Sequence, residues 1–93
     1  METLKQILEN YPELQLLKLP NSFDHCIIGL EAKNHLVVYS EELIIRQLMS
    51  EGLDFEDAYD HYSFNILGSY VGEKTPIFIE TFITIWQTRK KTN

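Results

Sequence analysis

The sequence has few of the residues that define disulfide-rich, metal-binding or membrane proteins. Its 93 residues include one cysteine, Cys26, one tryptophan, three prolines and four glycines. A single cysteine forms no internal disulfide and supplies no cysteine-based metal site, which fits a reducing cytoplasm. No apolar run approaches the ~18 residues that span a bilayer, because residues 77–86, the longest, are interrupted by Glu80. The amino terminus carries Glu2 and Glu9 in place of the basic region of a signal peptide.

Basic residues are scarce as well, and the charge imbalance is local. Fourteen acids stand against eight bases, so the net charge is −6, and residues 41–60 account for all of it with seven acids and a single base. The seven acids are Glu41, Glu42, Glu51, Asp54, Glu56, Asp57 and Asp60. A nucleic-acid-binding surface requires the opposite sign. We therefore expect no direct nucleic-acid binding and a protein partner with a basic surface.

The patterning predicts one small α+β domain over residues 1–88, followed by a polar basic tail at residues 89–93. Apolar residues make up 44% of the chain, which argues against intrinsic disorder. The predicted order is α-β-β-α-α-β, with an antiparallel sheet of about three strands and helices packed on it. The spacing of Leu4, Ile7, Leu8 and Tyr11 predicts the first helix.

Two strands are predicted at residues 23–30 and 35–39, joined by a hairpin loop at residues 31–34. Alternation along such strands would place Ile28 on the same face as Tyr39 and would place Ile27 on the other face. The leucine-rich segment at residues 12–20 fits either a short helical turn or an extended cover over the core.

Two helices follow, and their boundaries are marked by polar residues. Ser40 is a favourable N-cap with two acids after it, Gly52 is a natural terminator, and Asp54 is the next N-cap. The β-branched and aromatic residues of 77–86 then predict a long final strand. If this strand lies at the sheet edge, it can pair with a second copy and form a homodimer.

Candidate chemistry is sparse, and we predict neither a catalytic residue nor a metal or cofactor site. Cys26 follows His25, but on a strand their side chains would point to opposite faces, so a buried, unreactive Cys26 is favoured over a nucleophile assisted by His35 or His61. Asp57 and His61 are one helical turn apart but lack a third ligand. The glycine-containing loop at residues 68–76 lacks the spacing of a phosphate-binding loop.

Binding surfaces are better candidates. The predicted partner-binding residues are the seven acids together with Tyr59. The loop and its neighbours form a second candidate, a ligand-binding loop made of Asn65, Ser69, Tyr70, Gly72, Glu73 and Lys74. The aromatic residues Tyr59, Tyr62, Phe64 and Tyr70 fit either the core or an interface, with the core favoured for each.

Several motifs in the middle of the chain occur together in one family. They are Val38-Tyr39-Ser40, Leu48-Met49, the helix start at residues 52–58, and the pattern Phe-Asn-x-x-Gly-x-Tyr-Val-Gly-Glu-x-Thr-Pro-x-Phe at residues 64–78. Through them the chain resembles, over residues 25–79, a widespread set of small uncharacterised proteins of phages, prophages and gut bacteria. The family has no established activity. The resemblance implies a phage or mobile-element setting, and with it an inhibitor of a host defence system such as an anti-CRISPR protein, acting in the host cytoplasm.

The function we expect is therefore that of a non-enzymatic interaction module. Its acidic helical surface would dock on a basic site of a host protein, such as a channel that normally holds nucleic acid. The alternative is a module, monomeric or homodimeric, that sequesters a small molecule with the 68–76 loop and the neighbouring aromatic residues.

Overall fold

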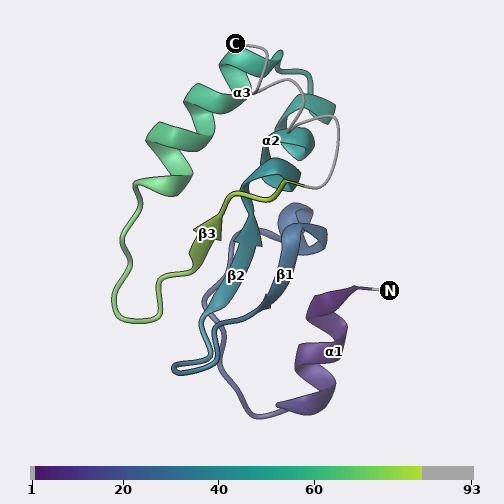
Figure 1. Ribbon diagram of the computed structural model, residues 1–93, viewed down its shortest axis with the longest axis vertical. Helices are drawn as coiled ribbons and strands as arrows, with labels where there is room; N and C mark the ends of the chain where they lie inside the picture. Colours follow the sequence, from purple (N-terminus) through teal and green to yellow (C-terminus); the bar gives the residue numbers. More distant parts are fainter. Residues whose placement is uncertain (1, 83–93) are drawn as a thin grey trace.

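The computed structural model describes residues 2–82 and shows an α+β domain built on a three-stranded sheet. The chain begins with helix α1 (Thr3–Asn10), crosses to the 3₁₀ helix η1 (Asn21–Cys26), and forms strands β1 (Ile27–Leu30) and β2 (Val37–Ser40). Helices α2 (Glu41–Ser50) and α3 (Phe55–His61) follow, then the π-helical segment η2 (Tyr62–Leu67) and strand β3 (Ile77–Ile79). Figure 1 shows the order β1-β2-β3 across the sheet. The predicted basic tail lies outside the described residues.

The sheet is mixed, which corrects the expected antiparallel arrangement. Strand β1 pairs antiparallel with β2, whereas β3 pairs parallel with β2, with Val38 opposite Ile77 and Ser40 opposite Ile79. The reason lies in the connection: α2, α3, η2 and a long loop carry the chain back along the sheet before β3 begins. A crossover of this kind returns a strand in the parallel direction.

The first predicted strand is half helical. Residues 21–26 form η1, and the strand begins only at Ile27. A bulge between Ile27 and Gly29 then shifts the register, so that Ile27 lies opposite Tyr39 and Leu30 opposite Val37. Ile27 is therefore buried beside Tyr39 and Ile28 is 38% exposed, which reverses the expected faces of these two isoleucines.

The helix boundaries follow the capping residues that the sequence displays. The Ser40 hydroxyl accepts a hydrogen bond from the Leu43 amide at 3.3 Å, and the Asp54 carboxylate accepts one from the Asp57 amide at 2.9 Å. Gly52 ends the turn after α2 with a φ of 118°, a conformation that L side chains rarely adopt. These three local predictions are confirmed.

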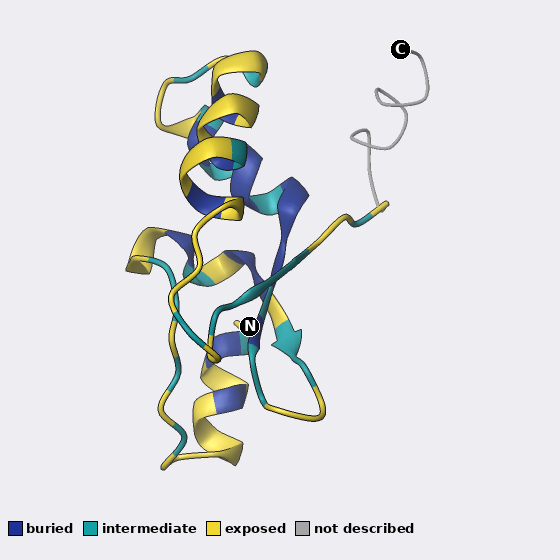
Figure 2. Cartoon of the chain, turned by 90° about the vertical axis from the view of Figure 1, so that its left-hand side faces the viewer, coloured by how far each residue is buried: buried dark blue, intermediate teal, exposed yellow. Residues whose placement is uncertain are grey.

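The core lies between one face of the sheet and the helices, which gather on that side in Figure 2. Tyr39 on β2 stacks on Phe78 of β3, with ring centroids 5.5 Å apart, and Phe78 meets Tyr62 of η2 edge to face. The segment at residues 12–20 forms neither helix nor strand and covers this core through Leu16 and Leu19, in agreement with the extended alternative. No helix within residues 2–82 is long and apolar enough to cross a bilayer.

Candidate functional site

The acidic region divides into two buried and five exposed carboxylates. Glu41 is 7% exposed and Glu42 is fully buried, so the prediction that they belong to the docking surface is wrong. The Glu42 carboxylate is 2.8 Å from the Arg46 guanidinium and accepts a hydrogen bond from the Thr81 hydroxyl at 3.3 Å. Glu41 lies beside the Tyr62 hydroxyl, and burial together with this carboxylate raises the pKa of Tyr62. Both acids are therefore part of the packed interior and do not belong to an exposed binding surface.

The remaining acids form a surface that we call the acidic helix surface. It is made of the five exposed residues Glu51, Asp54, Glu56, Asp57 and Asp60. No lysine or arginine occurs between residues 47 and 73, and within residues 2–82 no ion pair reaches these five carboxylates. Glu51 is the C-cap of α2 and Asp54 the N-cap of α3, whereas Glu56 and Asp57 lie in the first turn of α3, where the helix dipole favours negative charge.

Exposed aromatic residues continue along the same helical segment. Tyr59 is 42% exposed and Phe64 is 80% exposed, whereas Tyr62 is buried in the core. The π-helical geometry of η2 inserts a wider turn here, a feature that is rare and often found at functional sites. The preference for the core is therefore confirmed for Tyr62 and wrong for Tyr59, Phe64 and Tyr70, the last of which is 76% exposed. Acidic and aromatic side chains share one exposed helical ridge, formed by α3 and η2.

The predicted ligand loop lies beside a pocket, but only one of its predicted residues lines that pocket. The pocket has a volume of about 320 Å³ and lies between residues 17–19, the end of η2 and strand β3. Ser69 lines it, whereas Asn65, Tyr70 and Glu73 are exposed and are not part of its wall. The other lining residues are Leu17, Lys18, Leu19, Ile66, Val71, Pro76 and Phe78.

The loop itself is held by its own side chains. The Thr75 hydroxyl accepts a hydrogen bond from the Val71 amide at 3.0 Å and donates one to the Gly72 carbonyl. Lys74 reaches the Asn34 carbonyl of the hairpin loop at 3.5 Å. Gly72, whose φ of 111° requires glycine, completes a turn. Lys74 and Gly72 shape and anchor the loop in this structure.

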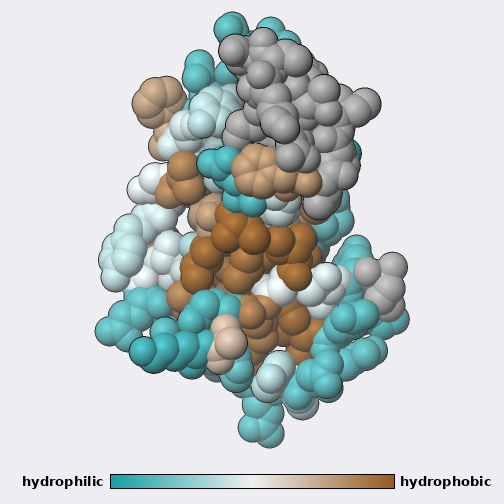
Figure 3. Space-filling view, viewed as in Figure 1, coloured by the Kyte–Doolittle hydropathy of each residue, from teal (hydrophilic) through white to brown (hydrophobic). Residues whose placement is uncertain are grey.

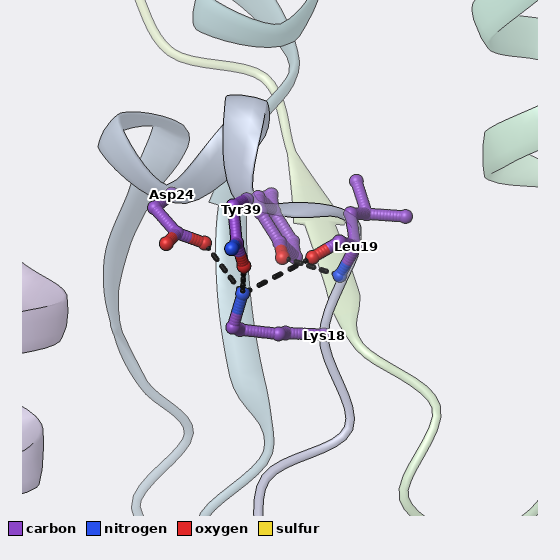
Figure 4. A network of polar contacts seen from close by, with 5 residues as sticks. Lys18, Leu19, Asp24 and Tyr39 are labelled. Atoms are coloured by element: carbon purple, nitrogen blue, oxygen red, sulfur yellow. Dashed lines mark hydrogen bonds and ion pairs between the residues drawn. The ribbon is translucent and has the colours of Figure 1, made fainter.

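The residues that sequence reasoning missed are those contributed by the 17–19 segment. Figure 4 shows how this segment is fixed: the Tyr39 hydroxyl accepts a hydrogen bond from the Leu19 amide at 2.8 Å, and the Lys18 ammonium contacts Asp24 at 2.8 Å. The leucine-rich pattern indicated that the segment covers the core. It did not indicate that its neighbours in space are η2 and β3.

Cys26 is close to a histidine but is not activated by it. Its sulfur lies 3.6 Å from His25 Nε2, which corrects the expectation that the two point apart, because η1 replaces the strand and its alternation. The thiol is fully buried, and burial and the nearby Asp24 raise its pKa to about 12. A thiol in this state is a poor nucleophile. Within the described residues, no three His, Cys, Asp or Glu side chains converge in a metal-binding group.

The opposite face of the sheet is apolar and partly exposed. In Figure 3, hydrophobic side chains gather over the sheet at the centre of the view. Val38 and Ile77 are half-buried there, and Ile79 is 41% exposed. Within residues 2–82, β3 has a neighbour on one side only and is an edge strand, which meets the condition for pairing with a second copy. The predicted long strand is shorter than expected, because β3 ends at Ile79 and residues 80–82 are not strand. Residues 83–86 lie outside the described residues.

Comparison with protein-family models, with curated proteins and with solved structures found no match for this chain. The features that bear on function are therefore the acidic helix surface, the exposed aromatic residues and the pocket at the end of η2.

Proposed function

We propose that this protein is a non-enzymatic interaction module that docks its acidic helix surface on a basic site of a partner protein. The observation that carries the proposal is the group of five exposed carboxylates within residues 51–60, in a stretch of sequence that has no lysine or arginine between residues 47 and 73. Such a surface attracts a basic partner and accelerates its association. Tyr59 and Phe64 supply exposed aromatic area on the same ridge, and aromatic residues are enriched at interfaces.

A protein site that normally holds nucleic acid is a partner of this kind. Its lysines and arginines are arranged to meet regularly spaced negative charges. A rigid helix with acids along one exposed side can occupy such a site and exclude the nucleic acid. An inhibitor of a host defence complex, the role implied by the resemblance of residues 25–79 to phage proteins, would act in this way in the host cytoplasm.

The proposal is tested with a matched pair of charge variants. One replaces Glu56, Asp57 and Asp60 by Gln, Asn and Asn, and the control replaces Glu2, Glu9 and Glu13 by Gln. Both remove three negative charges from exposed positions, so net charge changes equally. Asp54 is left unchanged because it caps α3.

The partner is first isolated by affinity capture from host lysate and identified by mass spectrometry, and binding is then measured with the purified pair. We expect the association rate to fall several-fold between low and high salt, because exposed charges are screened over roughly 8 Å at physiological ionic strength. The α3 variant should bind at least about tenfold more weakly than the control variant. Equal binding by the two variants, or an affinity independent of salt, would show that the acidic helix surface is not the docking site.

Self-association is a second candidate, favoured by the edge position of β3 and the apolar sheet face beside it. An exposed strand edge presents unpaired amide and carbonyl groups to another strand. A homodimer formed there would leave the acidic helix surface free, because α3 lies on the other side of the sheet.

A further inference from the structure

The pocket below the ridge is lined mainly by hydrophobic side chains. Its apolar wall is formed by Leu17, Leu19, Ile66, Val71, Pro76 and Phe78. Its volume of about 320 Å³ lies at the small end of the range of known ligand sites. It is therefore large enough for one sizeable side chain.

The two polar residues of the wall leave no unused charge for a ligand. The Lys18 ammonium is bound to the Asn21 side chain at 2.7 Å and to Asp24 at 2.8 Å, and it also contacts the Leu19 carbonyl. Figure 4 shows this ammonium turned toward Asp24. The Ser69 hydroxyl donates to the Asn65 carbonyl at 3.2 Å. A charged group in the pocket would lose its hydration without gaining a partner, so the occupant is apolar.

The rim of the pocket is apolar too. Two of the lining residues reach the surface, since Val71 is 59% exposed and Leu17 is 40% exposed. Asp57 and Ile66 are nine residues apart on the segment formed by α3 and η2, which separates them by ~13 Å along the axis at 1.5 Å per residue. Ile66 belongs to the buried side of this segment and Asp57 to its exposed side, so a bound chain must also pass around the ridge. An extended peptide needs about four residues for the axial distance alone, and a longer segment to reach around the ridge.

We propose that the pocket receives an apolar side chain, leucine or an aromatic residue, of a partner segment whose lysines or arginines contact the acidic helix surface. The inference rests on the proposed function and adds to it the apolar side chain that anchors the partner in the pocket. The acidic helix surface lies on the same α3–η2 segment, and no ion pair within residues 2–82 reaches it. It favours this occupant over a free apolar molecule, since such a molecule has no charge for the carboxylates to attract. A buried side chain in a pocket surrounded by weaker polar contacts is the usual form of an interface hot spot.

The test uses the full-length protein and fluorescein-labelled peptides that contain one leucine, a short Gly-Ser spacer and a run of lysines, in both orders. A matched peptide carries alanine in place of leucine. On the protein, Leu17→Asp and Val71→Asp place a charge at the rim, and Leu8→Asp on α1 is the control at a similar exposure of 46%. Each variant adds one negative charge, so general attraction for a basic peptide increases equally in all three.

We expect the leucine peptide to bind at least about tenfold more tightly than its alanine counterpart, which corresponds to the burial of one aliphatic side chain. Leu17→Asp and Val71→Asp should remove that difference, and Leu8→Asp should preserve it. Circular dichroism of the variants verifies that they remain folded.

The outcomes separate this inference from the proposed function. Equal binding of the leucine and alanine peptides, both weakened by neutralising Glu56, Asp57 and Asp60, would overturn the anchor and leave the acidic docking surface in place. Binding that requires leucine but is indifferent to those acids would overturn the proposed function. If the uncharged dye Nile red binds, is lost in Leu17→Asp, and the peptides do not bind at all, the pocket serves small apolar molecules and the inference is wrong.

Discussion

Tyr39 ties the 12–20 segment to the sheet through a single polar contact. Its ring is fully buried, and its hydroxyl accepts the hydrogen bond of the Leu19 amide at 2.8 Å. Tyr39→Phe keeps the packing but removes the acceptor for this backbone amide. We expect the free energy of unfolding to fall by about 1–2 kcal/mol, the cost of a half-buried donor without a partner. Chemical denaturation measures this change, and amide hydrogen exchange should show faster exchange at Leu19.

The matched control is Tyr59→Phe, which removes a hydroxyl from a ring that is 42% exposed. Its stability should stay within about 0.5 kcal/mol of the parent, as is usual for surface substitutions. If both variants lose the same stability, the Tyr39 hydroxyl is not what holds the segment.

Cys26 makes stability sensitive to alkaline pH. Its pKa is raised from the usual 9.0 to about 12 by burial and by Asp24, so the folded state resists ionisation that the unfolded state undergoes. The stabilising contribution is complete below pH 9 and is lost as pH rises from 9 toward 12. In that window the free energy of unfolding should fall by up to about 1.4 kcal/mol more per pH unit in the parent than in Cys26→Ala. Urea titrations at several pH values test this, and parallel pH profiles of the two proteins would contradict it.

Gly52 terminates the first turn after α2 in a conformation that only glycine adopts at low cost. With a φ of 118° and no atom within 4 Å of an added Cβ, the penalty for Gly52→Ala is conformational rather than steric. We expect a loss of about 1–2 kcal/mol in the free energy of unfolding. Gly68→Ala is the control, because Gly68 has a φ of −81° and room for a Cβ at 3.6 Å from the Ser63 carbonyl. That variant should be neutral or slightly stabilised in thermal denaturation, and a larger loss at Gly68 than at Gly52 would refute the argument.

Elements specified by neighbouring residues were predictable, and those specified by distant contacts were not. The caps at Ser40 and Asp54 depend on amides three residues away, so the sequence displays them directly. The 3₁₀ turn at residues 21–26 replaces an expected strand because its apolar residues, Phe23 and Cys26, reach the core at a spacing of three. A spacing of three suits a helical turn, and the sequence alone did not separate it from strand alternation.

The candidate site was predictable only in part, because its exposure and its pocket depend on contacts between residues far apart in the sequence. Acids in the first turn of a helix are recognisable from the sequence, but whether they face solvent depends on what packs above them. Glu42 is covered because Thr81, thirty-nine residues later, returns to it. The pocket likewise requires residues 17–19 to lie against η2 and β3, and no local pattern encodes that contact.

At the scale of the whole molecule, the helices leave one sheet face and one sheet edge uncovered among the described residues. Ile79 lies at that edge, 41% exposed, and faces the same side as Val38 and Ile77. If two copies pair through β3, the weight-average mass in sedimentation experiments should rise with protein concentration toward that of a dimer. Ile79→Lys should abolish the rise, because a lysine at a strand edge opposes pairing with another strand. Leu8→Lys on α1, at a comparable exposure of 46%, should leave it unchanged. A monomeric parent at every concentration, or equal effects of the two lysines, would rule out β3 as the contact between copies.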